Sequence, residues 1–323
     1  MEKAANKVAR LTQIEGLLVR HPGGLTQAEI ARHLRVHRST VGRYLPDLPA
    51  HIYLEDDGRW RIDRRAYLVS VRLSLHEALA LHLGARLMTT CMDKHSTHAA
   101  GALRKLGLAL ERLAPRIATH LEASAALMDD ENRRHDPVYM TALETLTEAW
   151  SMGRQVWLKY QSSPDKPVQE HLYAPYFIEP YAIGHSSYVF GWSEPPGELR
   201  TLKIERVRAI RIASEPYDIP PEFNVDRLLA DAWGIWYTDG DPVEVVLCFN
   251  PRVASRVRET QWHSSETLKD RADGSLLWRA NIAEPQEMLP WIRGWGPDVE
   301  VIAPAGLRAH IAEEMKAAAE IYA

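Results

Sequence analysis

The chain has 323 residues, of which 46 % are hydrophobic and 25 % are charged, so it has the length and composition of a globular protein with two or three domains. Its 43 Asp and Glu residues outnumber 39 Lys and Arg, and the formal net charge of −4 argues against a uniformly basic nucleic-acid binder. Two cysteines are too few for a disulfide framework, and the lack of a signal peptide or long apolar run predicts a cytoplasmic protein without a membrane span.

Three short helices are predicted at the N-terminal end of the chain. Apolar residues at helical spacing predict the first helix over residues 8–20. Thr26 and Glu29 have the spacing of a capping box, which predicts a second helix that ends near Leu34. A third helix is expected to open at Arg38 after a short turn.

Two short strands and a local excess of positive charge accompany these helices. Residues 52–54 and 59–62 flank an Asp-Gly turn, which is typical of a β-hairpin. Residues 1–65 contain 12 Lys and Arg against 8 Asp and Glu, a net charge of +4, so the remainder of the chain carries −8. The mild acidity of the whole chain therefore hides a basic N-terminal module.

The run from Thr26 to Val41 resembles a winged helix-turn-helix, with the hairpin as the wing. The resemblance implies that the helix opening at Arg38 enters the major groove while the wing touches the DNA backbone. Arg35 and His37 depart from the pattern, because the turn usually contains glycine and the recognition helix is usually capped by serine. The residues expected at DNA are Arg32, Arg35 and Arg59 for phosphates, Arg38, Ser39, Thr40 and Arg43 for base edges, and Tyr44 on the same outer face. The alternative is a small helical packing domain whose arginines are merely solvated.

A helical connector is predicted over residues 67–136. Ser74 and Glu77 have the capping-box spacing and mark the start of its first helix. An apolar stripe on that helix is expected to face a core, and it consists of Leu75, Leu79, Leu83 and Leu87. A second connector helix is predicted over residues 97–113.

One cluster in the connector has the residue types of a metal site. Cys91, Asp93, His95 and His98 fall within eight residues and include zinc-ligand types, which a metal-dependent hydrolase would use. The segment joins two helices, however, and no second ligand pair follows at a familiar spacing. We therefore interpret the cluster as a structural turn and expect neither a metal site nor a cofactor.

The composition changes at the end of the connector. Nine of the ten tryptophans lie from Trp150 onward, and aromatic and β-branched runs begin near Val156. The polar segment that ends at Pro137 is typical of a linker and marks the main boundary. A helix over residues 138–150 then precedes short strands with tight turns, which predict a small, strongly bent barrel.

This strand-rich region resembles the WYL domain of bacterial transcriptional regulators, a small Sm-like β-barrel. The resemblance rests on the strand around Pro175, the turn at Gly184, the basic strand that ends in Glu205-Arg206, and a signature strand that keeps only its tyrosine, Tyr188. The resemblance implies a pocket that senses a nucleic-acid fragment or a nucleotide. The matching effector-binding positions are His171, Tyr188, Arg200, Lys203 and Arg206.

The chemistry of these residues suits an anionic effector. We expect a bent barrel to bring Arg200 and Lys203 together, so that both neutralise a phosphate while Tyr188 offers a stacking face. The alternative is an ordinary surface strand on which Glu198 and Glu205 pair with the cations.

The last part of the chain is predicted to have the order β-α-β-β-α-β followed by a helix, which is a ferredoxin-like arrangement. It resembles the C-terminal extension that follows WYL domains, and the resemblance implies contacts across a homodimer. Arg252, Arg256 and Arg258 either face the pocket of a partner subunit or are solvated, and we favour solvation.

The predicted fold class is α+β, and the chain divides into four parts. These are a winged helix-turn-helix (1–66), a helical connector (67–136), a WYL effector-sensing domain with its leading helix (137–220) and a ferredoxin-like dimerisation domain (221–323). The predicted function is that of a homodimeric, non-enzymatic transcriptional regulator that binds a double-stranded DNA operator and senses single-stranded nucleic acid or a nucleotide. A nucleic-acid-sensing adaptor without operator binding, or a metal-dependent hydrolase, is the alternative. The sequence leaves activator and repressor equally open.

Overall fold

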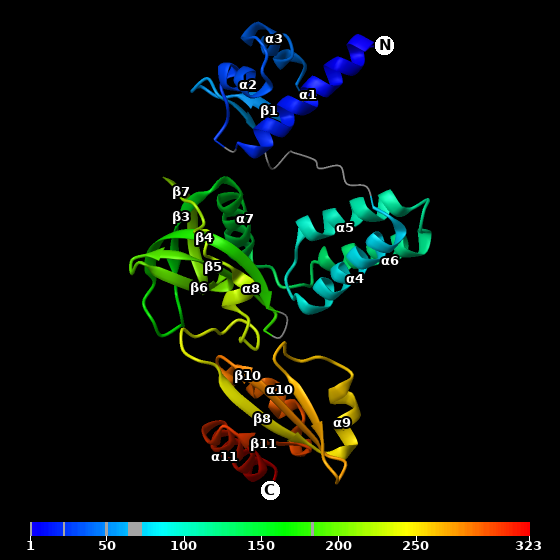
Figure 1. Cartoon of the computed structure of the whole chain (residues 1–323), viewed down its shortest axis with the longest axis vertical. Coiled ribbons are helices and arrows are strands. Elements are labelled where there is room, and N and C mark those ends of the chain that lie inside the picture. Colours follow the sequence, from blue (N-terminus) through cyan, green and yellow to red (C-terminus); the bar gives the residue numbers. More distant parts are fainter. Residues whose placement is uncertain (1, 22, 49–50, 64–72, 182–183) are drawn as a thin grey trace. The chain divides into compact units, whose positions relative to one another are not determined.

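The computed structural model describes residues 2–21, 23–48, 51–63, 73–181 and 184–323 (Figure 1). The chain separates into two compact units, Met1–Asp218 and Ile219–Ala323. Helices and antiparallel sheets occur in both units, so the α+β fold class is confirmed. Among the described helices, none combines the length and the apolar character that crossing a membrane requires.

The N-terminal module consists of helices packed against a small hairpin. Its elements are α1 (Glu2–Arg20), α2 (Gln27–Leu34), α3 (Arg38–Gly42), the 3₁₀ helix η1 (Leu45–Asp47), β1 (Ile52–Leu54) and β2 (Trp60–Ile62). Thr26 and Glu29 form the predicted capping box at the start of α2. The helices and the hairpin share one apolar core, which includes Ile14, Leu18, Leu25, Ile30, Val41, Leu45, Ile52 and Ile62.

Four helices follow the N-terminal module in the described part of the chain. They are α4 (Leu75–Cys91), α5 (Thr97–Leu110), α6 (Pro115–Met128) and α7 (Pro137–Met152). Helix α6 is not among the predicted helices, because its buried side is built partly from small residues such as Ser124 and Ala125, which give a weak apolar pattern.

The expectation that the leucines of α4 face a core is wrong. The side of α4 that is buried carries Ala78 and Thr89, and α4 packs on α6. Leu83 and Leu87 are 60 % and 61 % exposed, and Leu75 and Leu79 are also exposed. The physical reason is that small side chains allow the close approach of α4 and α6, so the leucines are left on the outer side.

A five-stranded antiparallel sheet follows α7. Its strands are β3 (Arg154–Tyr160), β4 (Gln169–Tyr181), β5 (Ser186–Glu194), β6 (Glu198–Lys203) and β7 (Val207–Pro216), in the order β6-β5-β4-β3-β7. The 3₁₀ helix η2 (Ile204–Arg206) joins β6 to β7. One face packs against α7, in a core that includes Tyr139, Leu146, Val156, Leu158, Tyr173, Val189 and Leu202. No ladder between β6 and β7 is present among the described residues, so the predicted barrel is not closed by hydrogen-bonded strands.

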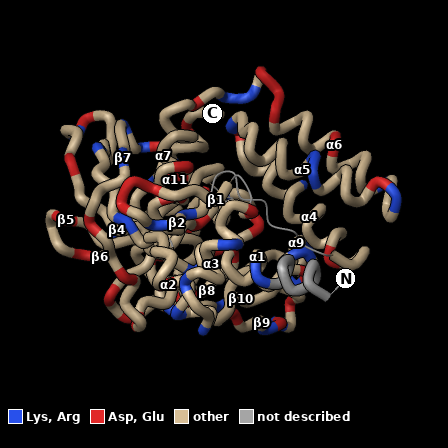
Figure 2. Tube along the Cα trace, turned by 90° about the horizontal axis from the view of Figure 1, so that it is seen from above, with Lys and Arg blue, Asp and Glu red and all other residues tan. Residues whose placement is uncertain are grey.

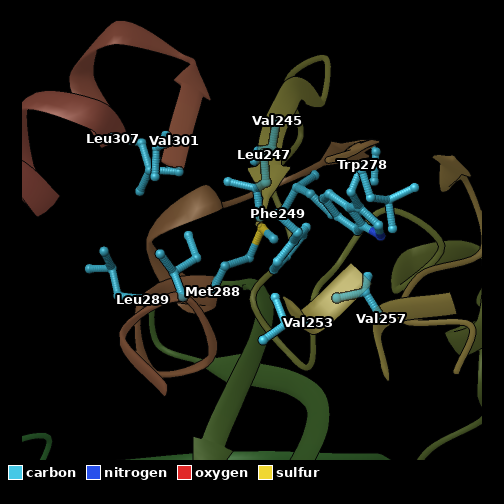
Figure 3. Close-up of a cluster of buried hydrophobic side chains, with 14 of the residues drawn as sticks. Val245, Leu247, Phe249, Val253, Val257, Trp278, Met288, Leu289, Val301 and Leu307 are labelled. Atoms are coloured by element: carbon cyan, nitrogen blue, oxygen red, sulfur yellow. The ribbon is translucent and has the colours of Figure 1, made fainter. Parts of the chain in front are cut away.

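The second unit has the predicted β-α-β-β-α-β order. Its elements are α8 (Val225–Leu228), β8 (Val243–Phe249), α9 (Pro251–Arg258), β9 (Thr267–Asp270), β10 (Leu276–Ile282), η3 (Pro285–Met288), α10 (Leu289–Gly294), η4 (Gly296–Asp298), β11 (Val299–Ala303) and α11 (Ala305–Tyr322). The sheet order is β11-β8-β10-β9, and every pairing is antiparallel. Phe249 and Trp278 lie at the centre of the apolar core of this unit (Figure 3). This order is that of a ferredoxin-like sheet.

Candidate functional site

The turn between α2 and α3 differs from the common helix-turn-helix in two residues, and the structure shows how both are accommodated. Arg35 adopts the left-handed conformation, with φ of 53°, and ends α2 where glycine would be less strained. His37 caps α3, because its Nδ1 accepts a hydrogen bond from the backbone N–H of Ser39 at 3.3 Å. The hydroxyl of Ser39 lies 2.8 Å from the same nitrogen. The cap of α3 is therefore made by an imidazole.

Most of the predicted DNA-contacting arginines are exposed on this module. Arg32, Arg35, Arg38 and Arg43 are exposed, and the Lys and Arg positions of α2 and α3 are blue in Figure 2. Within the described residues, Arg35, Arg38 and Arg43 have no ion pair. These side chains are available to an external anion.

The remaining candidates on this module are partly buried or already have hydrogen-bond partners within the protein. Thr40 is half-buried, and Tyr44 packs against the apolar core. Arg59 donates from Nη1 to the carbonyl oxygen of Gly24 at 2.9 Å and to Oε2 of Glu29 at 3.2 Å. The structure therefore gives Arg59 an internal contact between the hairpin and α2, which the sequence analysis did not anticipate.

Basic residues that the sequence analysis passed over lie on α1. Arg10 and Arg20 line a shallow hollow of about 300 Å³ together with His33 of α2. The ring of His33 lies 5.0 Å from that of His21. Arg10 and Arg20 lie on α1 and His33 lies on α2, so spacing along the sequence does not show that the three residues are neighbours.

Tyr188 and Lys203 lie directly opposite each other on β5 and β6. The Nζ atom of Lys203 is 5.9 Å from the centre of the Tyr188 ring, which is a cation–π distance. The ring of Tyr181 meets that of Tyr188 edge-on, with centres 6.0 Å apart. Burial raises the pKa of Tyr188, while the positive charge of Arg206 acts in the opposite sense. Tyr188, Lys203 and the exposed Arg206 therefore form one cluster, which we call the tyrosine–lysine cluster.

Arg200 and His171 lie apart from this cluster. Side chains alternate along a strand, so Arg200, three positions before Lys203, is on the other face of β6. Its Nε donates to Oε1 of Glu198 at 2.7 Å. His171 is only 4 % exposed, and its Nδ1 lies 3.0 Å from the hydroxyl of Ser193. The structure does not bring Arg200 and Lys203 together on one face, contrary to expectation.

Comparison with known protein families decides what this sheet is. A family model of the WYL domain matches residues 141–212, and one of the WCX domain matches residues 241–319. The protein carries a WYL domain and a WCX domain. The predicted resemblance is therefore confirmed for these two domains. No match is found among curated proteins.

Two solved structures are similar to this chain. Proteasome accessory factor B/C (PafBC) of Arthrobacter aurescens is 20 % identical, with a TM-score of 0.34, and the match covers 98 % of this chain and 49 % of that one. The chain thus spans about half the length of PafBC. A CRISPR Cas-related protein is 10 % identical, with a TM-score of 0.44, and 79 % of this chain and 75 % of that chain are covered. The domain assignment rests on the two family models.

Three of the four residues weighed as zinc ligands have separate partners, and Cys91 is a free cysteine. Asp93 pairs with Lys94, His95 stacks on His135 with ring centres 4.5 Å apart, and His98 lies 2.7 Å from a carboxylate oxygen of Glu144. Across the residues that the structure describes, no three His, Cys, Asp or Glu side chains come together as metal ligands would.

Two residues near the tyrosine–lysine cluster were missed by the sequence analysis. Thr201 lies two positions before Lys203 on the same face of β6, and its buried hydroxyl has no partner within the described residues. The alternation of side chains along β6 is the signal that could have found it. Lys94, in the connector, is buried against Glu205 of the WYL domain. No local pattern predicts that pair.

Proposed function

We propose that the protein is a transcriptional regulator that binds double-stranded DNA through its N-terminal module and senses an anionic nucleic-acid fragment or nucleotide through its WYL domain. In this proposal residues 1–66 are a winged helix-turn-helix, 67–136 a connector, 137–220 the sensor and 221–323 a dimerisation domain of a cytoplasmic homodimer. The observation that carries the proposal is the set of exposed arginines around α3 without ion pairs in the described residues: Arg35, Arg38 and Arg43. Such a set on a short helix after a tight turn suits phosphate and base-edge contacts.

The tyrosine–lysine cluster supports the sensing half of the proposal. An ammonium group beside an aromatic ring can hold a phosphate while a base stacks on the ring. Arg206 adds a second cation, and the buried hydroxyl of Thr201 is a further polar group on this face. We leave Arg200 and His171 out of the proposed site, because Arg200 is on the other face and His171 is buried.

The DNA-binding half is tested by gel shift on the region upstream of the protein's own gene. We expect the double variant Arg38→Ala, Arg43→Ala to weaken binding strongly and to lose most of the preference for this region over an unrelated duplex, since each lost base-edge contact costs about 1–3 kcal/mol of discrimination. The matched control is Arg112→Ala, Arg116→Ala, which removes the same charge from exposed connector positions.

The outcomes separate the candidate functions. Equal loss of binding in both double variants would contradict the recognition assignment. A wild-type protein that binds single-stranded oligonucleotides but no duplex would favour the adaptor.

A further inference from the structure

Lys94 is a buried cation in the connection between α4 and α5. Its side chain is 3 % exposed, and its Nζ lies 3.0 Å from Oε1 of Glu205 and 3.2 Å from Oδ1 of Asp93. It also lies 4.5 Å above the centre of the Tyr139 ring. Burial opposes its charge, but the hydrogen bonds to Glu205 and Asp93 outweigh burial and raise the pKa of Lys94. A buried ammonium persists only where such partners hold it.

Glu205 connects this cation to the strands that carry the tyrosine–lysine cluster. It lies in η2, between Lys203 and Arg206 in the chain. Its Oε1 also accepts a hydrogen bond from the backbone N–H of Ser187 at 3.2 Å, next to Tyr188 on β5. The hydroxyl of Ser187 in turn lies 3.0 Å from that of Tyr139 on α7. One carboxylate thus touches β5, η2 and the connector.

The segment that carries Lys94 is held at the C-terminal end of α4 by hydrogen bonds from and to residues 133 and 134. The guanidinium of Arg133 donates to the carbonyl oxygens of Thr89 and Met92. The backbone N–H of His95 donates to the carbonyl oxygen of Arg134 at 3.1 Å. Lys94 follows the last residue of α4 by three positions, so a shift of Lys94 is expected to act on that end of the helix.

We propose that the Lys94–Glu205 ion pair is the contact through which an anion at the tyrosine–lysine cluster regulates DNA binding. This inference rests on the proposed function and names the regulation of the same site. Glu205 precedes Arg206 directly in the chain, and its carboxylate accepts from the backbone N–H of Ser187, the neighbour of Tyr188. A phosphate bound at the tyrosine–lysine cluster therefore repels this carboxylate and weakens its pairing with Lys94. The two states are an intact pair without ligand and a weakened pair with ligand, in which Lys94 keeps Asp93 as its partner.

The test measures duplex affinity of the full-length protein with and without a 5′-phosphorylated oligothymidylate of about six to ten nucleotides. In the wild type we expect the oligonucleotide to change duplex affinity by about fivefold or more. Lys94→Met and Glu205→Gln are expected to bind the oligonucleotide but to lose that response. The double variant should lose no more than either single variant, because both act on one contact. Lys105→Met, at an exposed site on α5, is the matched control and should respond as the wild type does.

Two additional measurements keep the outcome decisive. Circular dichroism shows whether Lys94→Met folds. If it does not, Glu205→Gln tests the ion pair instead, because the glutamine keeps an acceptor for the N–H of Ser187. Hydrogen exchange at the His95 amide should quicken when the oligonucleotide binds the wild type. If both single variants respond as the wild type does, the ion pair is not the regulatory contact, while the proposed function stands. If the wild type does not bind the oligonucleotide, the sensing function fails and this inference fails with it.

Discussion

Arg200 and Lys203 lie on opposite faces of the same strand of the WYL domain. Lys203 faces Tyr188 across the β5–β6 pair, whereas Arg200 lies opposite Gly191 and pairs with Glu198. A ligand bound flat on one face of β6 can reach only one of these cations. The two residues, which look equivalent in the sequence, should therefore differ in function.

Lys203→Met should weaken binding of a 5′-phosphorylated oligothymidylate by about ten- to a hundredfold, since a charge-assisted contact is worth about 1.5–3 kcal/mol. Arg200→Met should change the affinity little, because Arg200 lies away from Tyr188 and already has Glu198 as a partner. Fluorescence anisotropy on both variants measures the difference. Equal losses would show that the ligand reaches both faces of β6.

Arg59 is predicted to matter more for the stability of the N-terminal module than for its DNA affinity. Its guanidinium ties the hairpin to α2 through Gly24 and Glu29. Arg59→Met should lower the thermal midpoint of the module and leave duplex affinity close to wild type at a temperature where the variant is folded. Arg38→Ala, at an exposed position, should instead lower the duplex affinity and leave the thermal midpoint close to wild type. Calorimetry and gel shift give the two readouts, and a large affinity loss in a folded Arg59→Met protein would contradict the internal role.

Local signals were enough to predict much of this fold. Thr26 with Glu29, and Ser74 with Glu77, form the capping boxes that their spacing predicts, because a cap depends on residues only three positions apart. The β-α-β-β-α-β order of the second unit is confirmed for the same reason, since alternation and helical spacing are local properties.

Contacts between distant segments account for what the sequence analysis missed. Lys94 and Glu205 are 111 positions apart, so only the packing of the connector on the WYL domain brings them together. The leucines of α4 look like a core stripe, but the small residues of α4 and α6 make the actual contact. Leu83 and Leu87 are exposed because the side of α4 that carries the small residues packs on α6. Helical periodicity alone does not determine which side of a helix is buried.

Gly191 should tolerate no side chain. A Cβ there would collide with the carbonyl oxygen of Ala174 and lie 2.8 Å from the Tyr173 ring. Gly191→Ala should therefore destabilise the WYL domain by about 1–3 kcal/mol, as overpacking does. Gly101→Ala, on α5 with open space around the new Cβ, should instead stabilise by about 0.5–1 kcal/mol. Urea denaturation measures both changes, and a neutral Gly191→Ala would contradict the close strand packing.

His263 should make the second unit sensitive to mild acid. Burial lowers the pKa of His263 below its ordinary value of 6.5, while Asp231 and Glu266 act in the opposite sense. The unfolded chain therefore binds the proton more readily than the folded protein does. The contribution of neutral His263 to the free energy of unfolding is fully present above about pH 6.5 and is lost as the pH falls through the pKa of His263 in the folded protein.

His263→Asn should reduce this pH dependence. The Nδ1 atom of His263 accepts from the backbone N–H of Ser265 at 3.2 Å, and the asparagine carbonyl can replace that acceptor without titrating. Urea midpoints at about pH 5 and about pH 7.5 can be followed by tryptophan fluorescence, since six of the ten tryptophans lie in this unit. We expect a smaller drop in the midpoint between the two pH values for the variant than for the wild type. An equal drop would mean that other groups cause the acid sensitivity.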